Sequence, residues 1–245
     1  MEKEGCGLQA KDKLIVALDF DAKQKALDMI RMLEDDVDFF KVGLELFLAS
    51  KGEVVDYLHN KGKKVFLDLK FMDIPNTVAG AAREAAKMGV FMFNVHTPGG
   101  KQMMVSAREA VEQAVAGGGQ KPLLIGVTVL TSLDQDDLAQ LGVSKNLKDL
   151  VLDRAILTKE AGLDGAVASP REATEIARIC GSKFLSVCPG IRPAWAVSGD
   201  QKRIMTPLEA INCGADYLVV GRPITQAEDP AENARKILAE MKEGI

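Results

Sequence analysis

Histidine and cysteine are scarce in this chain, and their scarcity argues against a common class of metal site. The 245 residues include only two histidines, His59 and His96, and four cysteines, none of which form a CxxC pair. Zinc sites use clustered Cys and His ligands at short spacing, so we expect no metal site. We expect the cysteines to be reduced and mostly buried, as in a cytoplasmic protein.

Long apolar runs and an excess of positive charge are missing too. No apolar segment reaches the length of a membrane-spanning helix, and the first ten residues lack the apolar core of a signal peptide. The formal net charge of −4 offers no basic surface for nucleic acid or an anionic membrane. We therefore expect a cytoplasmic protein without nucleic-acid or membrane partners, in which a local basic site holds any anionic ligand.

What the chain does contain is a regular alternation of short apolar runs with helical patterns. Alternating strands and helices predict a parallel sheet, and eight units in about 250 residues predict a closed (β/α)₈ TIM barrel. An open, doubly wound sheet is the alternative, although the chain has no GxGxxG or P-loop motif. We expect one domain over residues 1–245, with residues 1–11 as a flexible tail. The expected strands are 14–19, 38–43, 64–70, 91–97, 122–130, 165–169, 184–191 and 216–224.

Three charged residues interrupt the third apolar run, which reads VFLDLKFMDIPNT over residues 65–77. Asp68 and Lys70 are two apart and would share one face of a strand, while Asp73 lies just past the strand end. Buried charges are costly unless they are paired. A lysine held among carboxylates stays protonated, which suits a proton donor. A structural ion-pair ladder is the alternative interpretation.

Polar residues also stand at the ends of other strands, where TIM barrels carry their chemistry. Lys41 lies inside an apolar strand and would be costly there without a function. Asp19 could instead cap the helix that follows it, and Thr131 and Ser132 could be ordinary loop or capping residues. We leave His96 out of the site, as a core or rim histidine.

A phosphate site is expected near the end of the last strand, at Gly221 and Arg222. In TIM barrels the loops after strands seven and eight often bind phosphate. Glycine allows close approach of the backbone, and arginine is a bidentate donor. The irregular stretch 192–205 is long enough to be a lid that excludes water, and Gln201 within it could reach a phosphate oxygen.

Six segments of the chain together resemble the orotidine 5′-phosphate decarboxylase family in its bacterial form. They are ALD at 17–19, KVG at 41–43, DLKFMDIPNT at 68–77, VTVLTS at 127–132, PGIRP at 189–193 and VVGRPI at 219–224. They span almost the whole chain in the order of the family, and the DxKxxDIPNT string is highly specific. The resemblance implies a cofactor-free decarboxylation of orotidine 5′-monophosphate to UMP and CO₂, the last step of UMP biosynthesis.

The resemblance also implies roles for individual residues. Lys70 would protonate C6 of the pyrimidine, Asp68 would lie beside the substrate carboxylate, and Lys41 and Asp19 would hold the ribose hydroxyls. The implied catalytic set is Lys70, Asp68, Asp73 and Lys41. The family is a homodimer, in which Asp73 and Thr77 reach into the partner's site. The other implied substrate-binding residues are Ile74, Thr131, Ser132, Pro189, Arg192, Gln201, Gly221 and Arg222.

Two other functions stay open at this point. Magnesium-dependent sugar-phosphate decarboxylases or aldolases, of the keto-gulonate phosphate and hexulose phosphate type, share the DxKxxD core. Three features of this chain distinguish it from those enzymes: the IPNT continuation, the PGIRP segment that leads into a long lid, and the position of Gln201. A barrel that only binds a phosphate ligand is the third possibility, and it would leave the charged set around Lys70 without a use.

Overall fold

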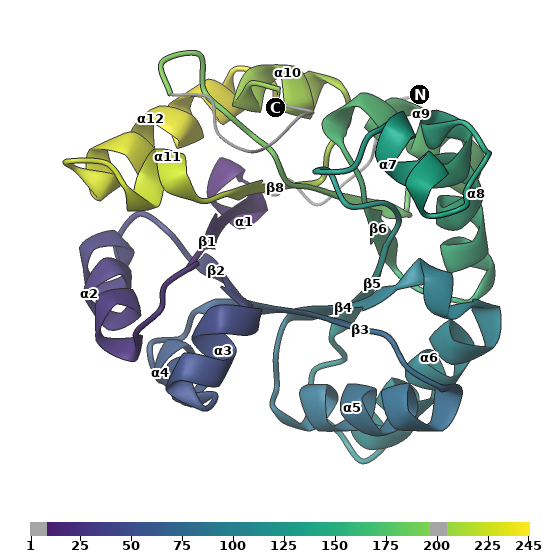
Figure 1. Cartoon of the computed structure of the whole chain (residues 1–245). Coiled ribbons are helices and arrows are strands. Elements are labelled where there is room, and N and C mark those ends of the chain that lie inside the picture. Colours follow the sequence, from purple (N-terminus) through teal and green to yellow (C-terminus); the bar gives the residue numbers. More distant parts are fainter. Residues whose placement is uncertain (1–8, 197–204) are drawn as a thin grey trace.

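The protein is a closed barrel of eight parallel strands surrounded by helices (Figure 1). The computed structural model describes residues 9–196 and 205–245. Each strand pairs with the next, and β1 pairs with β8 from Leu14 opposite Leu218 to Val16 opposite Val220, which closes the barrel. The predicted TIM barrel is therefore confirmed, and the open sheet is excluded. The strands are β1 (Leu14–Ala17), β2 (Phe39–Gly43), β3 (Lys64–Phe71), β4 (Met92–His96), β5 (Leu123–Val127), β6 (Gly165–Val167), β7 (Leu185–Cys188) and β8 (Tyr217–Val220).

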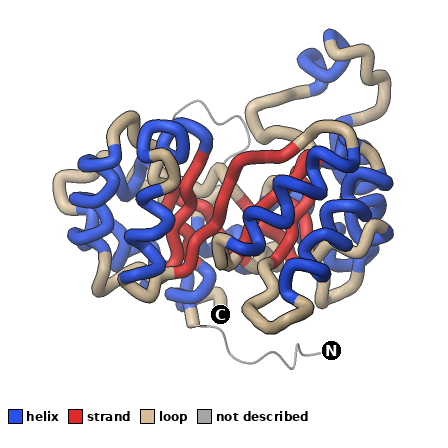
Figure 2. Tube along the Cα trace, turned by 90° about the horizontal axis from the view of Figure 1, so that it is seen from below, coloured by secondary structure: helices blue, strands red, loops and turns tan. Residues whose placement is uncertain are grey.

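Helices form the outer layer around the strands, as both the end view and the side view show (Figure 1, Figure 2). Among the helices in the described ranges, none combines the length and the apolar character needed to cross a membrane. The helices are α1 (Ala10–Lys13), α2 (Lys23–Leu33), α3 (Leu44–Ser50), α4 (Glu53–Asn60), α5 (Pro75–Lys87), the 3₁₀ helix η1 (Thr97–Gly99), α6 (Lys101–Val115), α7 (Gln135–Gln140), α8 (Leu147–Glu160), α9 (Pro170–Cys180), α10 (Pro207–Asn212), α11 (Arg222–Thr225) and α12 (Pro230–Lys242).

The strands divide their side chains between two hydrophobic layers, because successive residues of a strand point to opposite faces. On β1, Leu14 and Val16 belong to the large core between strands and helices, whereas Ile15 and Ala17 belong to a smaller cluster. Other members of that cluster, such as Phe66, line the barrel cavity described below. A residue's position in this alternation therefore decides whether its side chain can reach the interior of the barrel.

Several boundaries differ from the sequence predictions. The eighth strand ends at Val220 rather than at residue 224, and Arg222–Thr225 forms helix α11, whose early Pro223 suits the first turn of a helix. The single helix expected before β3 is divided into α3 and α4, because Lys51 and Gly52 adopt left-handed backbone angles.

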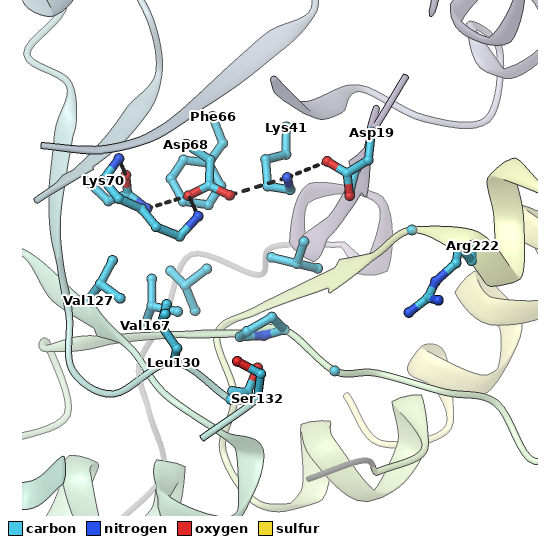
Figure 3. A pocket seen from close by; sticks show the side chains of 18 of the residues that line it. Asp19, Lys41, Phe66, Asp68, Lys70, Val127, Leu130, Ser132, Val167 and Arg222 are labelled. Atoms are coloured by element: carbon cyan, nitrogen blue, oxygen red, sulfur yellow. Dashed lines mark hydrogen bonds and ion pairs between the residues drawn. The ribbon is translucent and has the colours of Figure 1, made fainter. Parts of the chain in front are cut away.

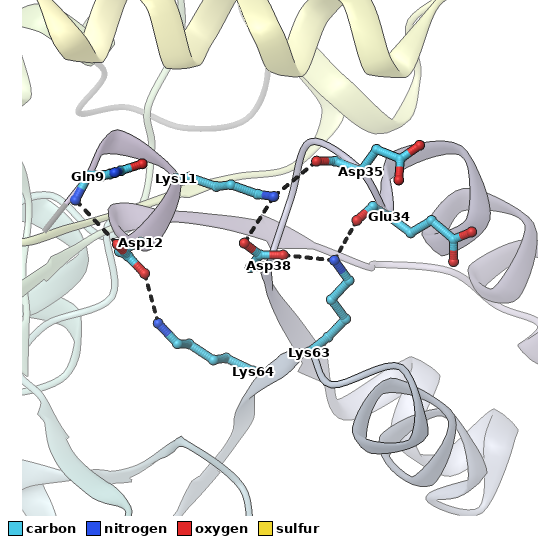
Figure 4. Close-up of polar contacts among 8 residues, drawn as sticks. All are labelled: Gln9, Lys11, Asp12, Glu34, Asp35, Asp38, Lys63 and Lys64. Carbon is cyan, nitrogen blue, oxygen red and sulfur yellow. Dashed lines mark hydrogen bonds and ion pairs between the residues drawn. The ribbon is translucent and has the colours of Figure 1, made fainter.

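The flexible tail was predicted over residues 1–11, but the barrel already includes residues 10 and 11. Helix α1 begins at Ala10, which is 2% exposed and packs in the main core. Ion pairs join α1 to the start of the sheet (Figure 4). Lys11 lies 3.0 Å from Asp38, which also pairs with Lys63, and Asp12 pairs with Lys64. Exposed pairs of this kind are individually weak, so the burial of Ala10 is the stronger reason for assigning α1 to the barrel.

Candidate active site

A cavity of about 420 Å³ opens among the carboxyl-terminal ends of the strands. This is the end of a TIM barrel at which active sites form. Ten of the sequence-predicted site residues line the cavity, and Figure 3 shows several of them. They are Asp19, Lys41, Asp68, Lys70, Thr131, Ser132, Pro189, Arg192, Gly221 and Arg222.

Four charged side chains of alternating sign form a row along one side of the cavity (Figure 3). Lys41 Nζ lies 2.8 Å from Asp19 Oδ1 and 3.2 Å from Asp68 Oδ2. Lys70 Nζ donates to Asp68 Oδ1 at 2.6 Å. Asp68 therefore lies between two ammonium groups, one on each of its oxygens. The strand alternation explains why three of them converge, since each follows an inward-facing apolar residue by two positions: Asp19 follows Ala17, Lys41 follows Phe39, and Asp68 follows Phe66.

Electrostatics keep the buried members of this row ionised. Burial by itself would raise the pKa of Asp68, but the charges of Lys41 and Lys70 outweigh it and hold that pKa below its usual value. Burial would likewise lower the pKa of Lys41, yet the carboxylates of Asp68 and Asp19 raise it above its usual value. The buried part of the row is therefore charged at neutral pH, as is needed to stabilise charge that develops in a reaction.

The backbone at Lys70 is unusual for a residue near a strand end. Its φ is 51°, in the left-handed region that non-glycine residues rarely adopt. The pairing of β3 with β4 also shifts register between Leu67 and Phe71. The simple two-residue alternation therefore does not describe Lys70, although its ammonium group reaches Asp68 as predicted. Such local strain is concentrated at functional sites, where the surroundings hold it.

Asn94 is a residue of the cavity that the sequence reasoning missed. It is 1% exposed on β4, and it contacts both the side chain of Asp68 and the backbone of Lys70. A polar residue two positions after inward-facing Met92, in the run FMFNVH, was the signal that could have identified it. Phe66, Leu130 and Gln226 also line the cavity and were not predicted.

Two arginines, Arg192 and Arg222, also line the cavity, and Figure 3 shows Arg222 on the side of Asp19, at the opposite end of the charged row from Lys70. Arg192 is 9% exposed, its backbone N–H donates to Met205 O at 2.9 Å, and its Nη1 donates to Ile191 O at 3.1 Å. Burial, followed by the charge of Arg222, lowers the pKa of Arg192. An anionic group bound here would offset the repulsion between the two guanidinium groups.

His96 lies near the row but does not line the cavity. Burial and the charge of Lys70 lower its pKa, so the imidazole is neutral at pH 7. Within residues 9–196 and 205–245, no group of three or more His, Cys, Asp or Glu side chains is arranged to hold a metal ion.

Three predicted site residues lie outside this cavity, and a fourth cannot be placed. Asp73, Ile74 and Thr77 are all exposed, and Asp73 Oδ1 accepts the N–H of Ile74 at 2.6 Å. They therefore add nothing to the cavity of their own chain. Gln201 lies outside the described residues.

Comparison with known proteins gives consistent results. Residues 12–237 match the Orotidine 5'-phosphate decarboxylase / HUMPS family. The chain is 51% identical over 235 residues to the orotidine 5'-phosphate decarboxylase of Syntrophotalea carbinolica, covering 96% of each chain. It is 49% identical to the enzyme of the same name from a Nostoc species, covering 95% of this chain and 98% of the relative.

A solved structure agrees as well. The crystal structure of orotidine 5'-phosphate decarboxylase from Lactobacillus acidophilus superposes with a TM-score of 0.83 at 38% identity, covering 94% of this chain and 98% of that one. Both the sequence match and the barrel extend over nearly the full length. The chain belongs to the orotidine 5'-phosphate decarboxylase / HUMPS family.

Proposed function

We propose that this protein decarboxylates orotidine 5′-monophosphate to UMP and CO₂, as the last step of UMP biosynthesis in the cytoplasm. One observation carries the proposal: Lys70 Nζ is held 2.6 Å from Asp68 in a cavity whose wall also bears Arg192 and Arg222. A protonated amine and an anion-binding site in one cavity suit a substrate with a reacting base and a remote phosphate. Relatives about half identical carry the name of this activity.

In the proposed reaction the bond between C6 and the carboxylate carbon breaks, and its electron pair stays on C6. No carbonyl group adjacent to C6 can take up these electrons, so a vinyl carbanion has to be stabilised where it forms. The Lys70 ammonium lies beside it, stabilises the negative charge and donates a proton to C6, and the lysine then regains a proton from water. Charges that are fixed before the reaction need no reorganisation, which makes electrostatic preorganisation the main contribution.

The other residues of the row bind and organise. Asp68 is beside the substrate carboxylate and fixes the two lysines. Lys41 and Asp19 hold the ribose hydroxyls, and Thr131 and Ser132 lie near the pyrimidine edge with Pro189. Support for these assignments comes from their common position on the cavity wall.

The phosphate end supplies binding energy. Gly221 and Arg222, with Gln201, grip the phosphate, and Arg192 lies at the root of a closing lid. Energy from a non-reacting group can be used to organise the reacting centre. The phosphate is therefore expected to raise the rate at the distant base, and not only the affinity.

The assembly proposed is a homodimer with shared sites, in which Asp73, Ile74 and Thr77 serve the neighbouring subunit. All three are exposed, and the side chain of Ile74 is 67% exposed next to Met72 at 54%. Leu44 and Leu48, on the helix after the neighbouring strand β2, are 55% and 74% exposed. Large apolar side chains exposed together often mark an interaction surface.

The first test is direct. Purified protein is incubated with orotidine 5′-monophosphate and EDTA, and loss of the orotate ultraviolet band is followed. We expect full activity in EDTA, and none in a Lys70→Ala variant that keeps the wild-type circular dichroism spectrum. Sensitivity to EDTA would instead favour a metal-dependent sugar-phosphate enzyme, and an inactive wild type would favour a barrel that only binds.

The second test concerns the phosphate grip. Arg222→Ala should lower kcat/KM for the nucleotide by roughly 10- to 1,000-fold, because charge-assisted hydrogen bonds contribute about 1.5–3 kcal/mol each and Arg binds phosphate bidentately. Orotidine, which lacks the phosphate, should react far more slowly than the nucleotide and be insensitive to this substitution. Arg178→Ala, an exposed arginine paired with Glu175 on α9, is the control. If the nucleoside and the nucleotide reacted equally fast, the proposed contribution of phosphate binding to the rate would be contradicted.

The third test concerns the shared sites. Asp73→Asn and Lys70→Ala proteins should each be inactive, but after subunit exchange the mixed dimers contain one intact site. An equal mixture should recover about a quarter of wild-type activity, since half of the dimers are mixed and each has one of two sites intact. The control mixes Lys41→Ala with Lys70→Ala, two residues of the same cavity, and should recover nothing. Mixed dimers detected by native mass spectrometry without recovered activity would disprove shared sites.

A further inference from the structure

Asn94 connects Lys70 to Asp68 through both ends of its side-chain amide. Its Oδ1 accepts the backbone N–H of Lys70 at 2.8 Å, and its Nδ2 donates to Asp68 Oδ1 at 2.7 Å. The same Asp68 oxygen accepts from Lys70 Nζ at 2.6 Å. Asn94 is 1% exposed, so water does not readily replace either contact. Lys70, Asp68 and Asn94 are thus joined pairwise in a ring of hydrogen bonds, in which Asn94 is the most buried residue.

The backbone of Lys70 explains why such a contact is needed. The left-handed φ of 51° is unfavourable for a residue with a Cβ. The register shift between Leu67 and Phe71 interrupts the regular pairing of β3 with β4 at this point. A buried N–H without an acceptor is costly, and the Asn94 side chain provides the acceptor for Lys70. The amide therefore stabilises the particular backbone conformation that aims this lysine.

The amide also restricts Asp68. Its Oδ2 faces Lys41 at 3.2 Å, and its Oδ1 receives both Lys70 and Asn94. Without the Asn94 donor, the carboxylate could rotate toward either lysine, because two ammonium groups alone do not fix its plane. A neutral donor holds the carboxylate without adding charge to the row.

We propose that Asn94 is a positioning residue, which fixes the left-handed backbone of Lys70 and the carboxylate plane of Asp68 so that the ammonium group is aimed at the reacting carbon. This inference rests on the proposed decarboxylation. It assigns Asn94 no contact with the reacting atoms. A merely structural role would make Asn94 important for stability alone, and the two roles predict different kinetics.

The test measures kcat and the dissociation constant for UMP in an Asn94→Leu variant. This substitution keeps the size of the side chain and removes both polar ends. We expect kcat to fall by about 100-fold, the scale of loss for a reacting group misplaced by about 1 Å. The dissociation constant for UMP should change by less than about threefold, because the phosphate grip lies elsewhere on the wall. The control is Val65→Ala on the same strand as Lys70, a buried residue of the main core that does not line the cavity. It should destabilise the protein while leaving kcat unchanged.

A second variant keeps the inference testable if Asn94→Leu does not fold. Asn94→Asp retains an acceptor for the Lys70 N–H but replaces the donor with a second carboxylate facing Asp68. The charged or titratable groups around this pair are Lys41, Lys70 and His96. We expect reduced kcat at pH 7, with the ratio to wild type improving as pH falls, because a shared proton would restore a donor between the two carboxylates. If the Asn94→Asp variant kept the kcat of the wild type across the whole pH range, the inference would be overturned.

Failure of the function and failure of this inference are distinguishable. An inactive wild type would overturn the function, whereas an active wild type with unchanged kcat in both Asn94 variants would overturn only the role of Asn94. A crystal structure of Asn94→Leu gives a readout that does not depend on activity. We expect Lys70 to leave the left-handed region or its Nζ to move away from Asp68, and an unchanged Lys70 would contradict the positioning role.

Discussion

The Asp68 carboxylate between Lys41 and Lys70 is the interaction on which the site depends. Burial of a carboxylate is unfavourable, and here two ammonium groups outweigh that cost and lower its pKa. In return, Asp68 holds both lysines inside a cavity where they would otherwise repel each other. The barrel supplies the positions, since β2 and β3 are adjacent and present Lys41 and Asp68 to the same interior.

In the proposed function, the reacting base and the phosphate of the substrate lie at different parts of the cavity. Lys70 lies at one end of the charged row, and Arg222 lies beyond the other end, while Arg192 and Arg222 follow strands β7 and β8. A rigid barrel keeps the two parts at a fixed spacing, so binding energy gained at one end can organise the other. Loops after different strands can then serve different purposes, while the strands hold the reacting groups in place.

Much of this arrangement could be predicted from the sequence. Eight strand–helix units predicted the barrel, and the positions of Asp19, Lys41 and Asp68 along their strands placed them at one end of it. The geometric rule of strand alternation placed Asp68 and Lys70 on one face of the third strand. The rule could not predict the left-handed backbone of Lys70, since lysine itself has no preference for that conformation and the tertiary contacts impose it. Asn94 escaped notice because its apolar neighbours made the strand look like ordinary core. Arg222 was predicted as part of a strand but begins a short helix, a boundary that Pro223 indicates.

The most direct test of the central interaction is the pH dependence of stability in wild type and Asp68→Asn, measured by urea unfolding from pH 8 to pH 3. A carboxylate whose pKa is lowered on folding stabilises the protein above its unfolded pKa of about 3.9, and this stabilisation is lost as pH falls through the lower folded pKa. We predict that the advantage of wild type over Asp68→Asn is constant from pH 8 to about pH 5 and declines below about pH 4. If wild type instead gained relative stability as pH fell from 6 to 4, burial would dominate at Asp68, and the two lysines would not be holding its charge.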